Sequence, residues 1–152
     1  MFNIVLHEPR IPQNTGTIGR LCFATDCKLH LIKPYGFEIT EKALRRAGLD
    51  YWKDLQLYEY DDIEDFWNQN PLDEHHFFAT TKTDKTIYEA DFVPNSYFYF
   101  GREDAGLPSD IMDKLPNNKV TLPMKNEARS LNIANSVSIV VYEGIRQNLG
   151  EF

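Results

Sequence analysis

The sequence predicts one α/β domain in which a mainly parallel sheet is flanked by helices on both faces. Short apolar segments typical of strands alternate with segments of helical periodicity, and this alternation favours parallel strands joined by crossover helices. The length of 152 residues is that of a single domain. No internal repeat and no linker-like tract divides the chain, so we expect the domain to span residues 1–152.

The first half of the chain predicts strands and helices in strict alternation. Phe2–Leu6 is a short apolar strand, and a helix capped by Asn14 or Thr15 should follow it to about Asp26, because both side chains can accept hydrogen bonds from free backbone N–H groups. One face of that helix carries residues at helical spacing, namely Ile18, Leu21, Cys22 and Thr25. The next expected elements are a strand at Lys28–Ile32, a helix at Thr40–Ala47 ended by Gly48, a strand at Leu55–Tyr60 and an acidic helix at Asp61–Asn68.

The second half predicts aromatic strands and a long final helix. The expected elements are strands at Phe77–Thr81 and Tyr97–Phe100, a short helix at Pro108–Leu115, a strand at Val120–Leu122 and a helix at Leu131–Leu149. Within the final helix an apolar residue recurs every four positions, which predicts a stripe that faces the core: Ile133, Val137, Val141, Ile145 and Leu149.

Composition excludes several classes of protein. No apolar run approaches the ~20 residues of a membrane span, and the N-terminus has no basic segment typical of a secretory signal, so a soluble cytoplasmic protein is expected. Cys22 and Cys27 are the only cysteines and are too few for a zinc site. His75 and His76 are adjacent and would point to opposite faces of a strand. We therefore expect no metal.

The net charge of −7 is unevenly distributed. Residues 54–74 contain eight acidic side chains and no Lys or Arg, so the rest of the chain is close to neutral. Basic residues gather elsewhere, at Lys42, Arg45 and Arg46 and again at Lys82 and Lys85. The charge distribution therefore permits a nucleic-acid partner without indicating one.

Three polar segments follow predicted strands, where ligands bind in parallel α/β folds. They are Asn14–Arg20, Phe100–Pro108 and Leu122–Asn132. The first places two glycines at the start of a helix but lacks the pattern of a dinucleotide or Walker loop. In the second, Glu103 could bind a ligand or hold loop backbone. In the third, Ser130 could be a ligand contact or simply the helix cap.

Together, the three segments resemble the motifs of the SPOUT superfamily of S-adenosylmethionine-dependent RNA methyltransferases. The opening Ile4–Cys22 is similar to the TrmL group, which methylates the 2′-hydroxyl of the wobble nucleotide (cytidine or uridine 34) of certain leucine tRNAs. Further matching stretches are Leu29–Ile32, Leu44–Tyr51 and Ser136–Arg146. The resemblance implies a trefoil knot in the C-terminal part, a homodimer whose first motif completes the partner's site, and tRNA as the substrate.

The resemblance also assigns residues. It implies that S-adenosylmethionine binds at Ala79, Thr80, Gly101, Leu122 and Ser130, and is released as S-adenosylhomocysteine. The catalytic residues that it implies are Arg20, Asn14, Glu103, Ser130 and Asn132. Arg20 would assist loss of the hydroxyl proton, either as a base or by contacting the adjacent phosphate. We favour the phosphate contact, because Arg stays protonated far above neutral pH.

Alternative functions remain open on the sequence alone. One is a SPOUT ribose methyltransferase that acts on another tRNA or rRNA position. Another is a catalytically inactive RNA-binding relative, although the presence of all five implied catalytic residues argues against it. A phosphate-loop nucleotide hydrolase is disfavoured, because the first segment lacks the Lys that such a loop requires.

Overall fold

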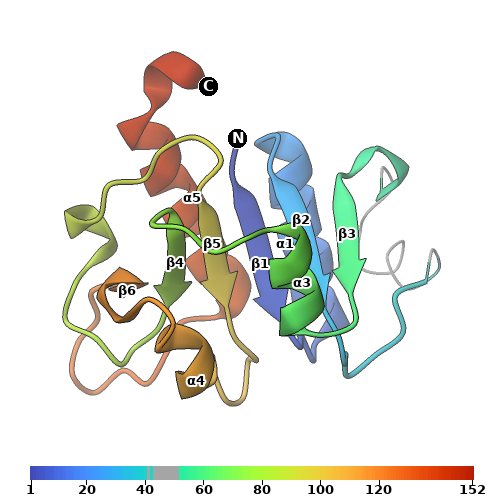
Figure 1. Ribbon diagram of the computed structural model, residues 1–152, viewed down its shortest axis with the longest axis horizontal. Helices are drawn as coiled ribbons and strands as arrows, with labels where there is room; N and C mark the ends of the chain where they lie inside the picture. The colour runs from blue at the N-terminus through green and yellow to red at the C-terminus, as the bar shows by residue number, and fades with distance from the viewer. Residues whose placement is uncertain (41, 43–51) are drawn as a thin grey trace.

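The computed structural model describes residues 1–40, 42 and 52–152, and within them the chain forms a six-stranded sheet (Figure 1). All neighbouring strands are parallel, in the order β3-β2-β1-β5-β4-β6. The strands are β1 (Asn3–His7), β2 (Lys28–Ile32), β3 (Leu57–Tyr60), β4 (His76–Ala79), β5 (Tyr97–Phe100) and β6 (Lys119–Val120). The predicted fold class, a mainly parallel sheet flanked by helices, is confirmed.

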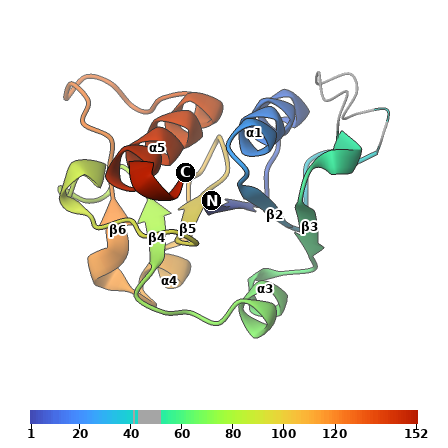
Figure 2. The same ribbon diagram turned by 90° about the horizontal axis from the view of Figure 1, so that it is seen from above.

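Helices cover both faces of the sheet (Figure 2). α1 and α5 lie side by side on one face, and α3 and α4 lie on the other. The α-helices are α1 (Pro12–Ala24), α3 (Ile63–Gln69), α4 (Ser109–Met112) and α5 (Ile133–Gln147). Short 3₁₀ turns are found at Trp52–Asp54, Ile87–Glu89, Pro116–Asn118 and Leu149–Glu151. The expected helix at Thr40–Ala47 lies almost wholly outside the described residues.

Each predicted strand overlaps an observed strand, but several differ from it at their ends. The bounds of β2 and β5 are as predicted, whereas β4 ends two residues before the predicted Thr81. β6 comprises only Lys119–Val120, so Leu122 lies beyond the strand. The reason is that the chain leaves the β4–β6 ladder to form the loops described below, although the local composition still favours a strand.

The predicted cap of the first helix was wrong. α1 begins at Pro12, with Ile11 at the N-cap position, so Asn14 and Thr15 lie inside its first turn. Proline suits this position because its fixed φ matches the helix and it has no N–H group to satisfy. The predicted inner face is confirmed, since Ile18 and Cys22 are buried against the sheet.

The final helix begins and ends inside its predicted range. Asn132, rather than Ser130, is its N-cap, and its side-chain oxygen accepts a hydrogen bond from the Asn135 N–H. Of the predicted core stripe, Ile133 is partly buried against the core, and Val137, Val141 and Ile145 are buried. Leu149 breaks the pattern: the helix ends at Gln147, and the Leu149 side chain is 67% exposed in the following 3₁₀ turn.

The order of the strands places a crevice at the centre of the sheet. From β1 the chain first moves outward through β2 to β3, then crosses to β4 on the other side of β1, returns inward to β5 and finally reaches the edge strand β6. Such a change of direction opens a crevice at the carboxyl ends of the strands, where ligands of parallel sheets bind. The first and second polar segments follow β1 and β5, which flank this change of direction, and the third follows the edge strand β6.

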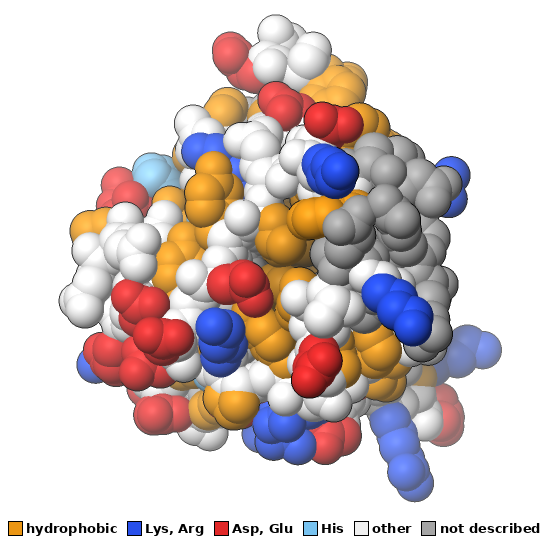
Figure 3. All heavy atoms as spheres, turned by 90° about the vertical axis from the view of Figure 1, so that its right-hand side faces the viewer, with side chains coloured by type: hydrophobic (Ala, Val, Ile, Leu, Met, Phe, Trp, Pro, Cys, Tyr) orange, Lys and Arg blue, Asp and Glu red, His pale blue; other side chains and the backbone are white. Residues whose placement is uncertain are grey.

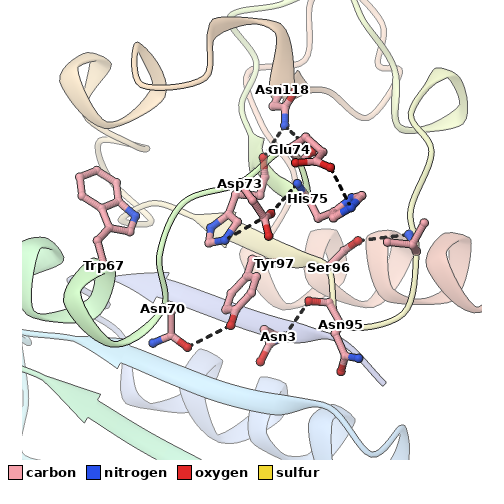
Figure 4. Close-up of polar contacts among 12 residues, drawn as sticks. Asn3, Trp67, Asn70, Asp73, Glu74, His75, Asn95, Ser96, Tyr97 and Asn118 are labelled. Atoms are coloured by element: carbon pink, nitrogen blue, oxygen red, sulfur yellow. Dashed lines mark hydrogen bonds and ion pairs between the residues drawn. The ribbon is translucent and has the colours of Figure 1, made fainter.

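Two buried histidines lie on the sheet face that α3 covers. His30 Nε2 donates to the Asn3 side-chain oxygen, and its Nδ1 accepts from the Tyr60 hydroxyl, both at 2.9 Å. His76 Nδ1 accepts from the Tyr99 hydroxyl at 2.6 Å, while its Nε2 lies 3.8 Å from a carboxylate oxygen of Asp73. The same Asp73 carboxylate accepts from the His75 N–H (Figure 4). Desolvation by burial lowers the pKa of each histidine from 6.5 to about 4.

These two histidines predict a loss of stability in mild acid. Below pH 6.5 the unfolded chain binds protons that the folded chain excludes until about pH 4, so the free energy of unfolding falls as the pH falls through this window. We expect a loss of about 2 kcal/mol for each histidine on going from about pH 7.5 to about pH 5, measured by urea unfolding. His76→Asn should reduce the loss, whereas His75→Asn, at a half-exposed position, should not. An equal loss in all three proteins would contradict the assignment.

The acidic segment lies away from the crevice. Asp61, Asp62 and Glu64 are exposed at the start of α3, on the sheet face opposite α1 and α5. Figure 3 views the molecule from its β3 side and shows acidic side chains gathered along one border of this view.

Cys22 and Cys27 are free and buried. Within the described ranges, no helix has both the length and the apolarity to cross a membrane.

Candidate active site

A cleft of about 510 Å³ opens at the carboxyl ends of β4, β5 and β6 and is bounded by the start of α5. Its size is within the range of about 300–1,000 Å³ that small-molecule sites occupy. Loops from four parts of the chain line it, and these loops include most of the second and third polar segments and the start of the first. All five predicted cofactor contacts are among the lining residues: Ala79, Thr80, Gly101, Leu122 and Ser130.

The lining combines an apolar wall with polar groups, as a nucleoside with a charged tail requires. Ile87, Leu107 and Val140 contribute apolar surface that could contact a flat base. Thr80 and Ser136 supply hydroxyl groups, and Asn14 and Asn132 supply side-chain amides. No group of three or more His, Cys, Asp or Glu side chains suited to a metal ion occurs in the part of the chain that the structure describes.

Gly101 is required by the close approach of two backbone segments. A Cβ atom at this position would lie 2.0 Å from the Gly106 carbonyl carbon and 2.1 Å from the Leu107 nitrogen. The loop between them folds back on itself through a bridge between Arg102 and Gly106, and Gly106 has a φ of +72°. The second segment therefore forms a tight loop that brings backbone to the cleft.

Glu103 joins the second polar segment to the first. One carboxylate oxygen accepts from the Arg10 N–H at 3.0 Å, and the other accepts from the Ile11 N–H at 3.1 Å. Both donors belong to the loop that enters α1, where backbone N–H groups have no partner within the helix. Glu103 thus holds backbone, as one of the two sequence-based interpretations proposed, but the backbone belongs to another loop.

Asn14 and Asn132 meet at the edge of the cleft. The Asn132 side-chain nitrogen donates to the Asn14 side-chain oxygen at 3.2 Å, across 118 positions of sequence. The other Asn132 side-chain atom caps α5 through Asn135, so its orientation is determined from both sides. This contact joins the first and third segments, and both Asn side chains line the cleft.

Arg20 is the one predicted catalytic residue that the fold does not bring to this cleft. It lies in the last turns of α1, its side chain is exposed, and it does not line the cavity. Arg102 does line it, but its guanidinium binds both carboxylate oxygens of Asp104, at 2.9 and 2.7 Å, and these hydrogen bonds lower the pKa of the Asp104 carboxyl.

Two cations of the lining are conspicuous in the sequence but were not assigned to the site. Lys82 and Arg129 both line the cleft, and neither was among the predicted site residues. Lys82 follows Thr80 by two positions in a polar loop, and Arg129 directly precedes Ser130. Their adjacency to predicted contacts was the signal that could have identified them.

Removal of the Glu103 charge is expected to loosen the first segment. In Glu103→Ala the Arg10 and Ile11 N–H groups lose their acceptors, at a cost of about 1–3 kcal/mol in the free energy of unfolding. Thermal and urea unfolding measure this effect. Glu64→Ala, which removes an exposed carboxylate of α3, is the control and should change stability by less than about 0.5 kcal/mol. Equal small effects would show that the Glu103 contacts contribute little.

The comparisons with known proteins agree with this geometry. Residues 1–142 match the model of the SpoU rRNA Methylase family. A tRNA (cytidine(34)-2′-O)-methyltransferase of Yersinia pestis is 46% identical, over 97% of this chain and 94% of its own. The enzyme of the same name from Burkholderia ambifaria is 42% identical, over 97% of this chain and 96% of its own.

Solved structures extend the likeness to three dimensions. A structure that concerns the 2-OH methylation of C/U34 on tRNA superposes with a TM-score of 0.92 at 36% identity, over 99% of this chain and 98% of that one. The SpoU methyltransferase AviRb of Streptomyces viridochromogenes, in complex with AdoMet, shares the fold with a TM-score of 0.80 at 22% identity, over 97% of this chain and 57% of its own. The chain therefore belongs to the SpoU methylase family and has the fold of the SPOUT methyltransferases.

Proposed function

We propose that this protein transfers a methyl group from S-adenosylmethionine to the ribose 2′-hydroxyl of nucleotide 34 in tRNA, with leucine tRNAs as its substrates. The observation that carries the proposal is the cleft, in which all five expected cofactor contacts converge although they come from three separate loops, after β4, β5 and β6. The names of relatives at 42–46% identity over nearly their full length support the same reaction and the same nucleotide. A tRNA substrate is in keeping with the expected cytoplasmic location.

The cleft residues fit the proposed methyl donor. Backbone held close by Gly101 and the apolar surface of Ile87 and Val140 suit an adenosine group, while Ser130 and Asn132 offer hydrogen bonds to its polar portions. The donor supplies an electrophilic methyl on a cationic sulfur, so transfer to an oxygen requires no metal. The main contribution of the protein is then to align the two reactants.

The residues of the chain divide this task. Asn132, fixed by its bond to Asn14 and by its cap of α5, would orient the ribose at the cleft edge. Glu103 holds the entry to α1 and so sets the position of the first segment. Arg20 would contact the phosphate next to the attacking ribose hydroxyl and so orient that hydroxyl. The hydroxyl proton would pass to solvent or to the substrate itself. The charged guanidinium is a poor base but a good ligand for phosphate.

The position of Arg20 supports a homodimeric site. Because Arg20 is exposed and absent from the cleft of its own chain, we propose that it completes the cleft of a second copy. α5 offers a surface for that copy: its outward side carries Ile139 and Tyr142, which are 39% and 56% exposed, while its inner side is buried in the core. A helix that is apolar on both sides is typical of one with partners on both sides.

The trefoil knot remains part of the proposal. Two contacts support it: the Ile87 N–H donates to the Thr121 carbonyl and the Thr121 N–H donates to the Lys85 carbonyl. They hold the segment after β6 beside the loop after β4, next to the cleft.

Transfer of labelled methyl to total RNA from cells that lack the enzyme, separated afterwards into tRNA and rRNA, tests the proposed function. We expect the label in a 2′-O-methylated nucleotide 34, located by digestion and sequencing of the product. Label at another tRNA or rRNA position would assign the same chemistry to a different substrate. Cofactor binding without label in any RNA would indicate an inactive relative. Failure to bind the cofactor at all would overturn the proposed reaction.

A further inference from the structure

We propose that Lys82, Lys125 and Arg129 form a basic rim at the mouth of the cleft, which binds RNA phosphates beside the target nucleotide. The inference rests on the proposed function and adds to it the surface by which an acidic protein holds its polyanionic substrate. None of the three residues is among the expected catalytic or cofactor contacts.

The fold brings Lys82 and Arg129 to one opening from two segments, and Lys125 follows the lining residue Met124 in the same loop as Arg129. Lys82 lies in the loop after β4, and Arg129 lies in the loop before α5, and both line the cleft. The segments that carry them are joined by hydrogen bonds between Thr121 and the backbone on either side of Thr86. Lys125 begins a turn that leads to Arg129, closed by the Ala128 N–H donating to the Lys125 carbonyl.

The charges of the rim are available to a ligand. Each of the three side chains is exposed, and in the described part of the chain none forms an ion pair. By contrast, Arg102, which lines the same cleft, is neutralised by Asp104, and Arg146 on α5 is neutralised by Glu143. Lys82 and Arg129 are thus cations of the cleft lining that no carboxylate of the described residues neutralises.

The proposed reaction places phosphates at this rim. A ribose hydroxyl can react only if it reaches within roughly 3 Å of the methyl group held in the cleft. The phosphates on either side of that ribose must then lie across the mouth. The net charge of −7 is concentrated in residues 54–74 and the rest of the chain is close to neutral, so attraction of RNA to the mouth requires local cations there.

The salt dependence of tRNA binding tests the rim. The single variants Lys82→Ala, Lys125→Ala and Arg129→Ala and the triple variant are compared with Lys28→Ala, which removes an exposed lysine at the opposite, amino-terminal edge of the sheet. For each, the affinity for tRNA is measured across a range of salt, and the affinity for S-adenosylmethionine is measured separately. We expect each single rim variant to reduce the magnitude of the slope of log affinity against log salt by about 0.7–0.9, and the triple variant to reduce it further. Lys28→Ala should leave the slope unchanged.

The outcomes separate this inference from the proposed function. If the native protein methylates tRNA but the triple variant shows the native salt dependence of tRNA affinity, the rim does not bind phosphates, and the proposed function stands. If Lys82→Ala weakens cofactor binding and leaves the slope unchanged, that lysine belongs to the cofactor site, and the inference fails for it. If the native protein neither binds nor methylates tRNA, the proposed function itself fails.

Discussion

Arg20→Ala is expected to lower kcat for methyl transfer by about 10²–10³-fold, the loss typical of removing one charged or hydrogen-bonding group that acts on the transition state. Affinity for S-adenosylmethionine should remain unchanged, because Arg20 does not line the cleft of its own chain. Single-turnover transfer of labelled methyl at saturating tRNA measures the effect. Folding should be unaffected, since the side chain is exposed on α1.

Two further variants define what Arg20 does. Arg20→Lys keeps the positive charge but loses the planar guanidinium, which can donate two parallel hydrogen bonds. Partial activity would therefore indicate that Arg20 contacts phosphate mainly through its charge. Gln13→Ala, on the same exposed side of α1, is the control and should retain activity. Near-normal kcat together with normal tRNA affinity in Arg20→Ala would remove Arg20 from the mechanism.

A mixing experiment tests whether Arg20 acts across a dimer. An Arg20→Ala chain keeps an intact cleft, and a Gly101→Ala chain keeps an intact Arg20. In a symmetric dimer, a mixed pair contains one complete site, so refolding the two inactive variants together should restore about a quarter of the native activity. No recovery, despite formation of mixed dimers, would contradict a site shared between subunits.

Gly101→Ala is expected to abolish cofactor binding, with a loss of affinity on the order of 10²-fold or more, because a Cβ atom cannot fit where two backbone segments approach this closely. The atoms it would meet, in Gly106 and Leu107, belong to backbone and cannot rotate away. The loop must therefore open, which we expect to cost about 1–3 kcal/mol in the free energy of unfolding. Calorimetric titration with S-adenosylmethionine and urea unfolding measure the two effects.

Gly150→Ala provides the matched control. A Cβ atom at Gly150 meets nothing within 4 Å, and the residue lies in the 3₁₀ turn after α5, away from the cleft. This variant should bind the cofactor normally and unfold as the native protein does. Normal cofactor affinity in Gly101→Ala would show that the loop adapts, and would argue against Gly101 as part of the binding site.

Much of the fold followed from local sequence patterns. The alternation of strand-like and helical segments predicted the parallel sheet, and β2 and β5 have the predicted bounds. The inner face of α5 is buried from Val137 to Ile145 as its spacing of four residues indicated. These features depend on which side chains neighbour each other along one element, and that information is present in a short stretch of sequence.

Errors occurred where the tertiary structure outweighed the local signal. Ser130 is a residue type that often caps helices, but the N-cap of α5 is Asn132. The Asn132 side chain also donates a hydrogen bond to Asn14 of α1. Leu149 fits the apolar period, but the helix ends before it. In both cases the end of the element depends on contacts from outside it, which periodicity does not contain.

The sequence by itself determined the class of fold, the order of its elements and, through resemblance, a set of expected cofactor contacts, all of which line the cleft. Only the tertiary structure decided that Glu103 holds the entry to α1, that Lys82 and Arg129 share one opening, and that Arg20 lies outside the cleft of its own chain. The reason is physical: hydrophobic periodicity acts within an element. Polar contacts between loops depend instead on the order in which strands pair, which brings residues about 90 positions apart within hydrogen-bond distance.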